Sequence, residues 1–545
     1  MGEQDGCGAR AASCGQTVSL ERLGEALATV QRQCPELAVL AIRWMHLKHP
    51  LHPVHGSLLR GEGWRKQTSD GSGAAAAAGR RIIWLYRLVE SVLYAGYCWG
   101  RLLWLHLWMR HELSALKARS FDLMIKTWVR GVGSATREED FYYGDLTQRL
   151  AQRAVRVLLI CGNGDGDGWV PFAKACAKTS LPWLSELCLV PLSAPLHMLA
   201  RQWRASRRLR RLAAKADDRL VKFLALLASR DCLAPETARA GLYYWIGHAA
   251  VDTWRPRAFL TIYESQGWEQ ALRWGIKTAD GSCRAIGYQH VPMFPEATSV
   301  LSPPWIGLPV HPDVVLCLGE ISQELLRAGH APYKTRLVRF GSVWYRASSI
   351  EHHADPARRT ILVIPEGHPS EVQALFRFAY ACARRMPSYT FILRRHPAFP
   401  MTRALRAVLA DMPQQPNVIF SQHPQIEDAA AQASAVLYRG SSAAVSAVLQ
   451  GAFPVYVPGS DGYEHDPLSG LPAWHAQCAA PEELAAVLVR HEQAPTAQLV
   501  AEWQAAVRYL KRCTGPVTDA SLEELIDAGR LSRAARAPVT EAIHA

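Results

Sequence analysis

The chain has 545 residues, of which 49% are hydrophobic and 20% charged; this composition excludes a disordered chain and is typical of a globular protein. A chain of this length exceeds what one hydrophobic core usually serves, so two domains are expected. The 61 basic and 48 acidic side chains give a formal net charge of +13. Such an excess suits a polyanion, an anionic membrane or a phosphate-bearing substrate, and a solvated basic surface equally well. No nucleic-acid-binding module accompanies it, so no nucleic-acid partner is expected.

The thirteen cysteines are scattered and form no C-x-x-C pair. This pattern indicates reduced core residues rather than a disulfide framework or a zinc site. Residues 1–16 lack the apolar stretch of a secretory signal. We therefore expect a cytoplasmic protein without a zinc site, and the sequence predicts no cofactor.

Residues 1–80 resemble a variable N-terminal tail and linker. Within them, residues 1–18 read as a flexible tail, and a helical pattern covers Leu20–Gln33. An apolar strand candidate follows at Leu37–Ile42. The low-complexity stretch Ser69–Gly79 (SDGSGAAAAAG) predicts a loop or linker.

The aromatic-rich segment Ile82–Trp108 is long enough to span a bilayer, but it carries Arg87, Glu90 and Arg101. Charges at membrane depth are costly, so a buried core helix is the leading interpretation. A membrane-surface helix is the second and a true span the last. The basic helical run Trp203–Lys215 reads as a solvated face, with docking on an anionic membrane as the alternative.

Short apolar strands alternate with helices in both halves of the chain, which predicts an α/β fold with two doubly wound domains facing across a cleft. The strand candidates are Val155–Cys161, Ala258–Glu264, Ala285–His290, Val314–Leu318, Leu337–Phe340, Thr360–Ile364, Thr390–Leu393, Val418–Phe420, Ala435–Leu437 and Pro454–Val457. The helix candidates between them are Trp268–Thr278, Ser322–Ala328, Glu371–Arg385, Arg403–Leu409 and Ala443–Leu449. The Pro-rich stretch Val291–Pro312 is the expected link, which gives domains of residues 81–295 and 310–530.

A polar motif follows the apolar strand at Thr390–Leu393. Arg394 and Arg395 could bind a phosphate in the bidentate manner of guanidinium groups. His396 could donate a ring N–H to a phosphate oxygen, and Pro397 fixes the turn. Solvated arginines beside a loop histidine are the alternative.

Two further strand ends in the same half carry polar residues. Arg439 and Gly440 follow one strand, and Ser441 and Ser442 then begin an Ala-rich helix. Free N–H groups and hydroxyls at a helix start can bind an anion, although a plain N-cap has the same sequence.

Glu366 and Gly367 follow the strand Thr360–Ile364. Glu366 could accept hydrogen bonds from sugar or ribose hydroxyls or act as an acid or base; simple loop polarity or a charge near a helix start is the alternative.

Because carboxyl ends of parallel strands meet at one crevice, the three strand-end motifs of this half predict one phosphate- or ribose-binding site.

The first half offers candidates for acid–base chemistry. Glu264 ends one strand, Glu269 lies five residues further in the following helix, and His290 closes the next strand. A group that removes a proton from an acceptor hydroxyl would suit this position. Glu264 is the first candidate, His290 the second or an acceptor contact, and Glu269 an acceptor-side residue. Loop hydrogen bonding is the alternative for these side chains.

The glycine-rich stretch Gly162–Gly168 follows the strand Val155–Cys161. It matches neither a dinucleotide fingerprint nor a P-loop, and it is not a complete EF-hand. Asp165 and Asp167 could contact an acceptor sugar or a cation, and a polar loop without a ligand is an equal interpretation.

The ordered trio Pro365-Glu366-Gly367, His396-Pro397 and Ser441-Ser442 resembles the motifs of bacterial sialyltransferases, polysialyltransferases and related capsule transferases. The resemblance implies a GT-B fold and a CMP-activated sugar. It implies that His396, Ser441 and Ser442 contact the donor's phosphate and nucleotide. It also implies transfer without an obligatory metal, because protein groups stabilise the leaving phosphate.

Over about residues 120–460 the chain is similar to bacterial surface-carbohydrate (O-antigen) biosynthesis proteins. Besides the trio, the segments that carry this resemblance are Lys126-Thr127-Trp128, Tyr142–Leu146 (YYGDL), Tyr263–Glu269 (YESQGWE) and Gly287–His290 (GYQH). It implies a glycosyltransferase of O-antigen, capsule or lipopolysaccharide assembly, with an acceptor-side first domain and a donor-binding second domain.

The partners expected from this resemblance are a nucleotide-sugar donor and a glycan or lipid-linked glycan acceptor. Peripheral contact with an anionic inner membrane is a further expectation. The alternatives are a CDP-glycerol-type polyol-phosphate transferase, which shares the fold, and a nonenzymatic scaffold that binds sugar or nucleotide.

Overall fold

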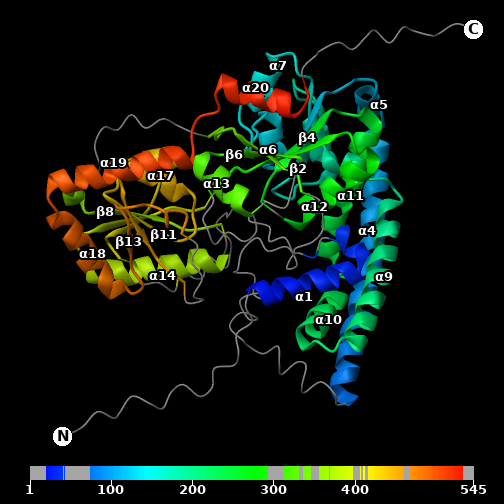
Figure 1. Cartoon of the computed structure of the whole chain (residues 1–545), viewed down its shortest axis with the longest axis horizontal. Coiled ribbons are helices and arrows are strands. Elements are labelled where there is room, and N and C mark those ends of the chain that lie inside the picture. Colours follow the sequence, from blue (N-terminus) through cyan, green and yellow to red (C-terminus); the bar gives the residue numbers. More distant parts are fainter. Residues whose placement is uncertain are drawn as a thin grey trace, which may run out of the picture.

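The structure is a computed structural model that describes residues 20–40, 42, 74–264, 266–292, 311–329, 335–344, 355–367, 369–396, 406, 409–410, 415–459 and 466–531. Two sheets with helices packed on them make two lobes (Figure 1). Every strand pair in both sheets is parallel. The expected α/β class with two doubly wound domains is confirmed.

The first sheet has the strand order β3-β2-β1-β4-β5-β6-β7. Its strands are β1 (Leu123–Val129), β2 (Val157–Asn163), β3 (Trp183–Ser185), β4 (Ala258–Ile262), β5 (Arg284–Tyr288), β6 (Val314–Cys317) and β7 (Arg336–Arg339). Strand β1 lies between β2 and β4 but was not predicted, because Lys126 and Thr127 interrupt its apolar run. Lys126 is fully buried and forms a 3.0 Å ion pair with Glu186, which satisfies its charge inside the core.

Most of the helices that pack on this sheet precede its strands or separate them in the sequence. They are α1 (Leu20–Gln33), α4 (Ala74–Trp108), α5 (Arg110–Lys117), α6 (Gly131–Thr136), α7 (Leu146–Ala151), α8 (Trp169–Ala177), α9 (Ala194–Lys215), α10 (Arg219–Asp231), α11 (Pro235–Trp254), α12 (Gly267–Ala279) and α13 (Glu320–Gly329). Helices α11 and α12 touch through glycines: a Cβ at Gly247 would lie 2.3 Å from the Leu272 carbonyl oxygen, and one at Gly275 would lie 2.0 Å from that of Tyr244. This close approach fixes α12, the helix that follows Glu264.

The N-terminal region differs from its prediction as a tail and linker. The predicted helix Leu20–Gln33 is confirmed, and its Leu23, Leu27 and Val30 side chains are fully buried in the first domain's core. The predicted strand Leu37–Ile42 is wrong, because Pro35–Ala38 form a 3₁₀ turn that buries the apolar side chains without pairing. Residues 1–19 and 43–73 lie outside the described part of the chain.

The alanine run also differs from its prediction as a loop. From Ala74 onward it is the start of helix α4, in keeping with the high helix propensity of alanine. Helix α4 packs one face on the first domain's core, where Leu102 and Leu105 are fully buried, and exposes the other. The leading interpretation as a core helix is therefore confirmed for one face only. Among the described residues, no helix combines the length and the apolar character needed to cross a membrane.

The predicted boundary between domains near Val291–Pro312 does not match the sheet pairing. Val314 pairs with Ile286 of β5, and Arg336 pairs with Val314, so β6 and β7 belong to the first sheet. Most of Val291–Pro312 lies outside the described residues. A proline-rich stretch identifies a loop, but it does not show which sheet the following strands join.

The second sheet has the order β10-β9-β8-β11-β12-β13. Its strands are β8 (Thr360–Ile364), β9 (Thr390–Leu393), β10 (Val418–Phe420), β11 (Ala435–Tyr438), β12 (Phe453–Tyr456) and β13 (Ala476–Gln477). Its helices are α14 (Pro369–Arg385), α16 (Ile426–Ala430), α17 (Ala443–Leu449), α18 (Pro481–Gln493) and α19 (Thr496–Cys513). The predicted strands β8 to β12 are confirmed to within one residue at each end. The predicted helix Arg403–Leu409 lies almost entirely outside the described residues.

The C-terminal segment returns to the first domain. Helix α19 buries Leu499 and Trp503 in the second core, whereas α20 (Asp519–Ala528) buries Leu522 and Leu525 in the first. The chain therefore crosses between the domains a second time, close to Pro516, which forms a bridge with Ser342.

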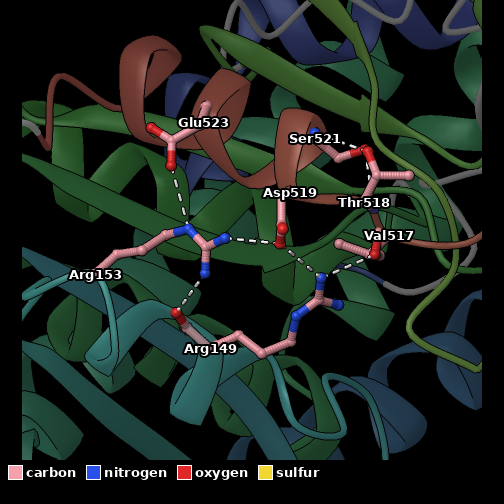
Figure 2. A network of polar contacts seen from close by, with 7 residues as sticks. All are labelled: Arg149, Arg153, Val517, Thr518, Asp519, Ser521 and Glu523. Carbon is pink, nitrogen blue, oxygen red and sulfur yellow. Dashed lines mark hydrogen bonds and ion pairs between the residues drawn. The ribbon is translucent and has the colours of Figure 1, made fainter.

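Polar contacts hold this return in place (Figure 2). Arg149 donates to the Val517 carbonyl oxygen at 2.9 Å, and Arg153 pairs with Asp519 at 2.7 Å and with Glu523 at 3.2 Å. Because the acidic partners are well exposed, these ion pairs orient α20 more than they stabilise it. Burial of the leucine side chains stabilises the contact between α20 and the first domain more than the ion pairs do.

Candidate functional site

Glu264 and His290 lie side by side at the carboxyl edge of the first sheet. Ile262 at the end of β4 pairs with Tyr288 at the end of β5, and each site residue lies two positions further along its chain. The Nε2 atom of His290 is 3.3 Å from Oε1 of Glu264. Because parallel neighbouring strands end at the same edge, the sequence predicts that these two residues lie close together, and the structure confirms it. A carboxylate paired with an imidazole is suited to accept a proton.

Glu269 supports Glu264 from inside the protein. Both of its carboxylate oxygens accept the backbone N–H of Glu264 at 3.1 Å, and it pairs with Arg273 at 3.3 Å. Its side chain is 0% exposed, so the predicted contact with an acceptor is wrong. Burial raises the pKa of Glu269 to about 7, although the charge of Arg273 opposes that rise.

The Tyr142 ring lies against His290, with centroids 5.0 Å apart in an edge-on arrangement. The buried Asp140 carboxylate fixes this turn by accepting the backbone N–H groups of Tyr142 and Tyr143 at 2.8 and 3.1 Å. Burial, and next the charge of Glu264, raise the pKa of Tyr142 to about 12. Tyr142 was not predicted as a site residue, although it lies in the YYGDL segment, because spacing alone does not show that this turn reaches β5.

Arg130 is a second residue that sequence reasoning missed. It follows β1 and precedes α6, and its guanidinium lies 4.9 Å from the Phe141 ring centroid. The pKa of His396 in the second domain is lowered by burial and then by the charge of Arg130. Arg130 also acts on the pKa of Tyr142. Its charge therefore acts on residues of both domains, and the omission of β1 from the prediction hid it.

The glycine-rich loop after β2 contacts the start of α6. An Asp167 carboxylate oxygen accepts the Val132 backbone N–H at 2.6 Å. Gly131 has φ of +58°, and a Cβ there would lie 2.3 Å from that oxygen, so glycine is required. Asp167 thus has an internal structural contact, whereas Asp165 is exposed on the same loop. Acceptor contact by either residue stays a prediction.

The three strand-end motifs of the second domain are brought together. A Cβ at Gly367 would lie 2.7 Å from Cε1 of His396, and a Cβ at Gly440 would lie 2.6 Å from Oε2 of Glu366. Gly440 has φ of +65°, which a side chain would disfavour. Each glycine therefore admits the polar side chain of a neighbouring motif, and the motifs at the ends of β8, β9 and β11 form one cluster.

The two serines of this cluster differ in exposure. Ser441 is buried, and Ser442 is the N-cap residue of the short helix α17 without a side-chain cap hydrogen bond. The Ser442 hydroxyl is therefore not used to cap the helix.

The arginines predicted to bind the donor have other contacts. Arg394 donates to the carbonyl oxygens of His423 and Pro424, each at 2.7 Å. Arg439 forms a 2.6 Å ion pair with Glu371 of α14, and both side chains are buried. These guanidinium groups hold loops and helices of the fold, which leaves them poorly placed to bind a phosphate. Arg395 is exposed, and Pro397 lies outside the described residues.

Two surface cavities lie away from these sheet edges. One of about 360 Å³ is lined by residues such as Arg22, Glu25 and Asp218, and one of about 540 Å³ by residues such as Asp355 and Glu492. Neither brings together the titratable groups of the sheet edges, so we locate the candidate site from its contacts.

In the described part of the chain, no group of three or more His, Cys, Asp or Glu side chains could hold a metal ion. Eleven cysteines there are free and buried, as predicted.

No protein-family model matches this chain, and no curated protein resembles it in sequence. Solved structures with a related fold include the kitacinnamycin glycotransferase (15% identity, 75% of this chain and 99% of that one, TM-score 0.42). CalG4, the calicheamicin glycosyltransferase, has 15% identity over 76% of this chain and 100% of that one, with a TM-score of 0.40. Anabaena HepE in complex with UDP and glucose has 11% identity, coverage of 75% and 98%, and a TM-score of 0.41. Likenesses of this degree do not establish activity, which depends on the residues of this chain.

The buried carboxyl of Glu269 gives a pH-dependent contribution to stability. Because its pKa is raised from 4.5 to about 7 in the folded protein, the protonated carboxyl stabilises the fold below pH 4.5. That stability is lost as the pH rises to about 7. We expect wild type to lose about 3 kcal/mol relative to Glu269→Gln between these pH values. Urea unfolding of both proteins across this pH range measures their free energies of unfolding. A difference in free energy that stays constant with pH would contradict the raised pKa of Glu269.

Proposed function

We propose that this protein is a glycosyltransferase of GT-B type that transfers a sugar from a nucleotide-activated donor to an acceptor hydroxyl. One observation carries the proposal. The carboxylate–imidazole pair Glu264–His290 lies at the carboxyl edge of one parallel sheet, the His396 cluster lies at that of the other, and the charge of Arg130 in the first domain helps to lower the pKa of His396 in the second. In open parallel sheets, ligands bind outside the carboxyl ends of strands.

The chemistry of the two edges supports a division of labour. Glu264 takes the proton of the acceptor hydroxyl, and the oxygen attacks the anomeric carbon of the donor sugar. The bond from that carbon to the nucleotide phosphate breaks, and the phosphate leaves with the negative charge. His396 and Arg130 are suited to stabilise that charge. The lowered pKa of His396 favours its neutral ring, which still donates one N–H.

His290 acts as an orienting partner in this scheme. Its contact with Glu264 at 3.3 Å and its edge-on contact with Tyr142 fix both rings beside the carboxylate. Glu269 fixes the backbone of Glu264 from below. The backbone of Glu264 is thus held by a buried group, which suits a base that must meet a bound hydroxyl.

The donor is a cytidine-based nucleotide sugar, and the acceptor is a glycan or lipid-linked glycan of bacterial surface polysaccharide. This part of the proposal rests on the resemblance of the PEG, HP and SS motifs and of the longer segments to capsule and O-antigen enzymes. The clustering of those three motifs supports it. We place the enzyme in the cytoplasm, at the inner face of the membrane, and without an obligatory metal.

Replacing Glu264 by Gln keeps the size of the side chain and removes its basicity. We expect transfer to fall by about a hundredfold or more, while nucleotide binding persists, because the base acts only in the chemical step. The measurement is sugar transfer from a nucleotide-sugar panel that includes CMP-linked donors. Glu139→Gln, an exposed carboxylate of the same domain, is the control and should be neutral. Unchanged turnover in Glu264→Gln would move the base to His290 or Asp165.

Replacing His396 by Ala tests the donor site. We expect a loss of about 1.5–3 kcal/mol in nucleotide binding, the contribution of a hydrogen bond to a charged group. Ser441→Ala and Ser442→Ala should each cost less, because the backbone amides remain. Calorimetry with CMP, UDP and CDP-glycerol measures the affinities. The control is His423→Ala, because His423 follows β10, the strand beside β9. Equal affinities in wild type and His396→Ala would contradict the site, and preference for CDP-glycerol would indicate polyol-phosphate transfer.

A further inference from the structure

Helix α4 exposes a large apolar face to solvent, and exposure of apolar surface to water is unfavourable. Between Ile82 and Trp108, every exposed position is a hydrophobic residue or a glycine. Twelve large side chains there are 43% to 69% exposed: Ile82, Ile83, Leu85, Tyr86, Val89, Val92, Leu93, Tyr97, Trp99, Trp104, Leu107 and Trp108. We call this set the α4 outer face. Contiguous apolar surface of this extent marks an interaction site in a folded protein.

Between Ile82 and Trp108, none of the charged side chains of α4 is fully exposed. Arg87 and Glu90 are half-buried and form a 2.6 Å ion pair with each other. Arg101 lies 4.7 Å from the Trp169 ring centroid and donates to the Tyr97 hydroxyl at 2.9 Å. A helix at a water-facing surface normally has the opposite arrangement, with its charges outward. The sequence of α4 is therefore suited to an apolar environment on its outer side.

Helix α9 places cations beside the α4 outer face. The two helices lie next to each other at the outer edge of the first domain (Figure 1), and the Trp84 indole N–H donates to the Ser206 hydroxyl at 2.8 Å. Helix α9 has no acidic residue and carries Arg201, Arg204, Arg207, Arg208, Arg210, Arg211 and Lys215. Arg210 lies over the Trp84 ring at 5.1 Å, and Lys174 lies over Trp108 at 4.0 Å. Cations thus flank both ends of the apolar face.

This combination selects one class of partner. An apolar stripe alone would suit a second copy of the chain, but seven cations on the adjacent helix would then repel those of the copy. Anionic lipid headgroups complement such a row of arginines, and Trp and Tyr side chains favour the boundary between headgroups and acyl chains. The stripe from Ile82 to Trp108 is about 40 Å long at about 1.5 Å per residue, and its residues share one side of the helix.

We propose that the α4 outer face docks on an anionic lipid bilayer, with α4 lying in the plane of the interface and the arginines of α9 on the headgroups. Helix α4 packs against Trp169, the first residue of α8, through Tyr97 with ring centroids 6.4 Å apart. Trp169 directly follows the loop of Asp165 and Asp167 at the carboxyl edge of the first sheet. Docking therefore brings the bilayer beside that edge, where a lipid-linked acceptor can reach Glu264; this consequence rests on the proposed function, whereas the docking does not.

Vesicle flotation with the full chain tests the docking without any sugar donor. The α4 variant combines Leu85→Ser, Val89→Ser, Leu93→Ser and Trp104→Ser, all at exposed positions. We expect wild type to bind vesicles of phosphatidylcholine and phosphatidylglycerol in equal parts, and the α4 variant to bind about a hundredfold more weakly. Ile419→Ser with Val489→Ser, exposed apolar side chains of the second domain, is the control and should bind as wild type does. Circular dichroism and urea unfolding confirm that each variant is folded.

A second variant tests the charges. Arg204→Gln, Arg207→Gln and Arg211→Gln should weaken binding to the anionic vesicles and flatten its salt dependence. Pure phosphatidylcholine vesicles should bind wild type more weakly than anionic ones do. Failure of wild type to bind, or equal binding by the α4 variant, overturns the proposal. A wild-type dimer in sedimentation that the α4 variant converts to monomers also overturns it, because a second copy would then cover the face.

Discussion

The constraint on which the structure depends is that every strand in each sheet runs parallel to its neighbours. All carboxyl ends of a sheet then lie at one edge, and loops far apart in sequence meet there. In the first sheet this brings Glu264 to His290, and Arg130 at the end of β1 contacts Phe141. In the second it brings the motifs after β8, β9 and β11 into contact through Gly367 and Gly440. The proposed chemistry needs no residue beyond those that this alignment collects.

Strands β8 to β12 could be predicted from the sequence, because they are short and apolar. Strand β13 and helices α16, α18 and α19 of the second domain were not predicted, and β1 and β3 of the first sheet were missed. Strand β1 has Lys126 at its centre, and only the buried contact with Glu186 makes that residue compatible with a core strand. Missing β1 also hid Arg130 at its end. Arg394, Arg439 and Glu269 were predicted for the site from their residue types and positions. The structure shows that each of these side chains instead binds a partner within the fold.

The surface formed by α4 and α9 lies on the same domain as the Glu264–His290 pair. Between Ile82 and Trp108, helix α4 pairs or half-buries its charges and exposes many apolar side chains, and α9 adds cations beside it. A sequence window shows that such a segment is hydrophobic and carries a few charges, but only the packing of α4 shows which side faces the protein. The contact of Tyr97 with Trp169 links this surface to the loop at the end of β2. The proposed acceptor site at the first edge and the proposed bilayer contact thus involve the same part of the domain.

The central claim is that residues from both domains act on one bound nucleotide. Calorimetry with CMP on Arg130→Met measures this directly, because Arg130 belongs to the first domain and its charge reaches His396 of the second. We predict a loss of affinity of about tenfold or more, the usual scale for a hydrogen bond to a charged group. Arg137→Met, an exposed arginine on the same side of the first domain, should bind CMP as wild type does. Wild-type affinity in Arg130→Met would contradict the account, because the two sheet edges would then not share the ligand.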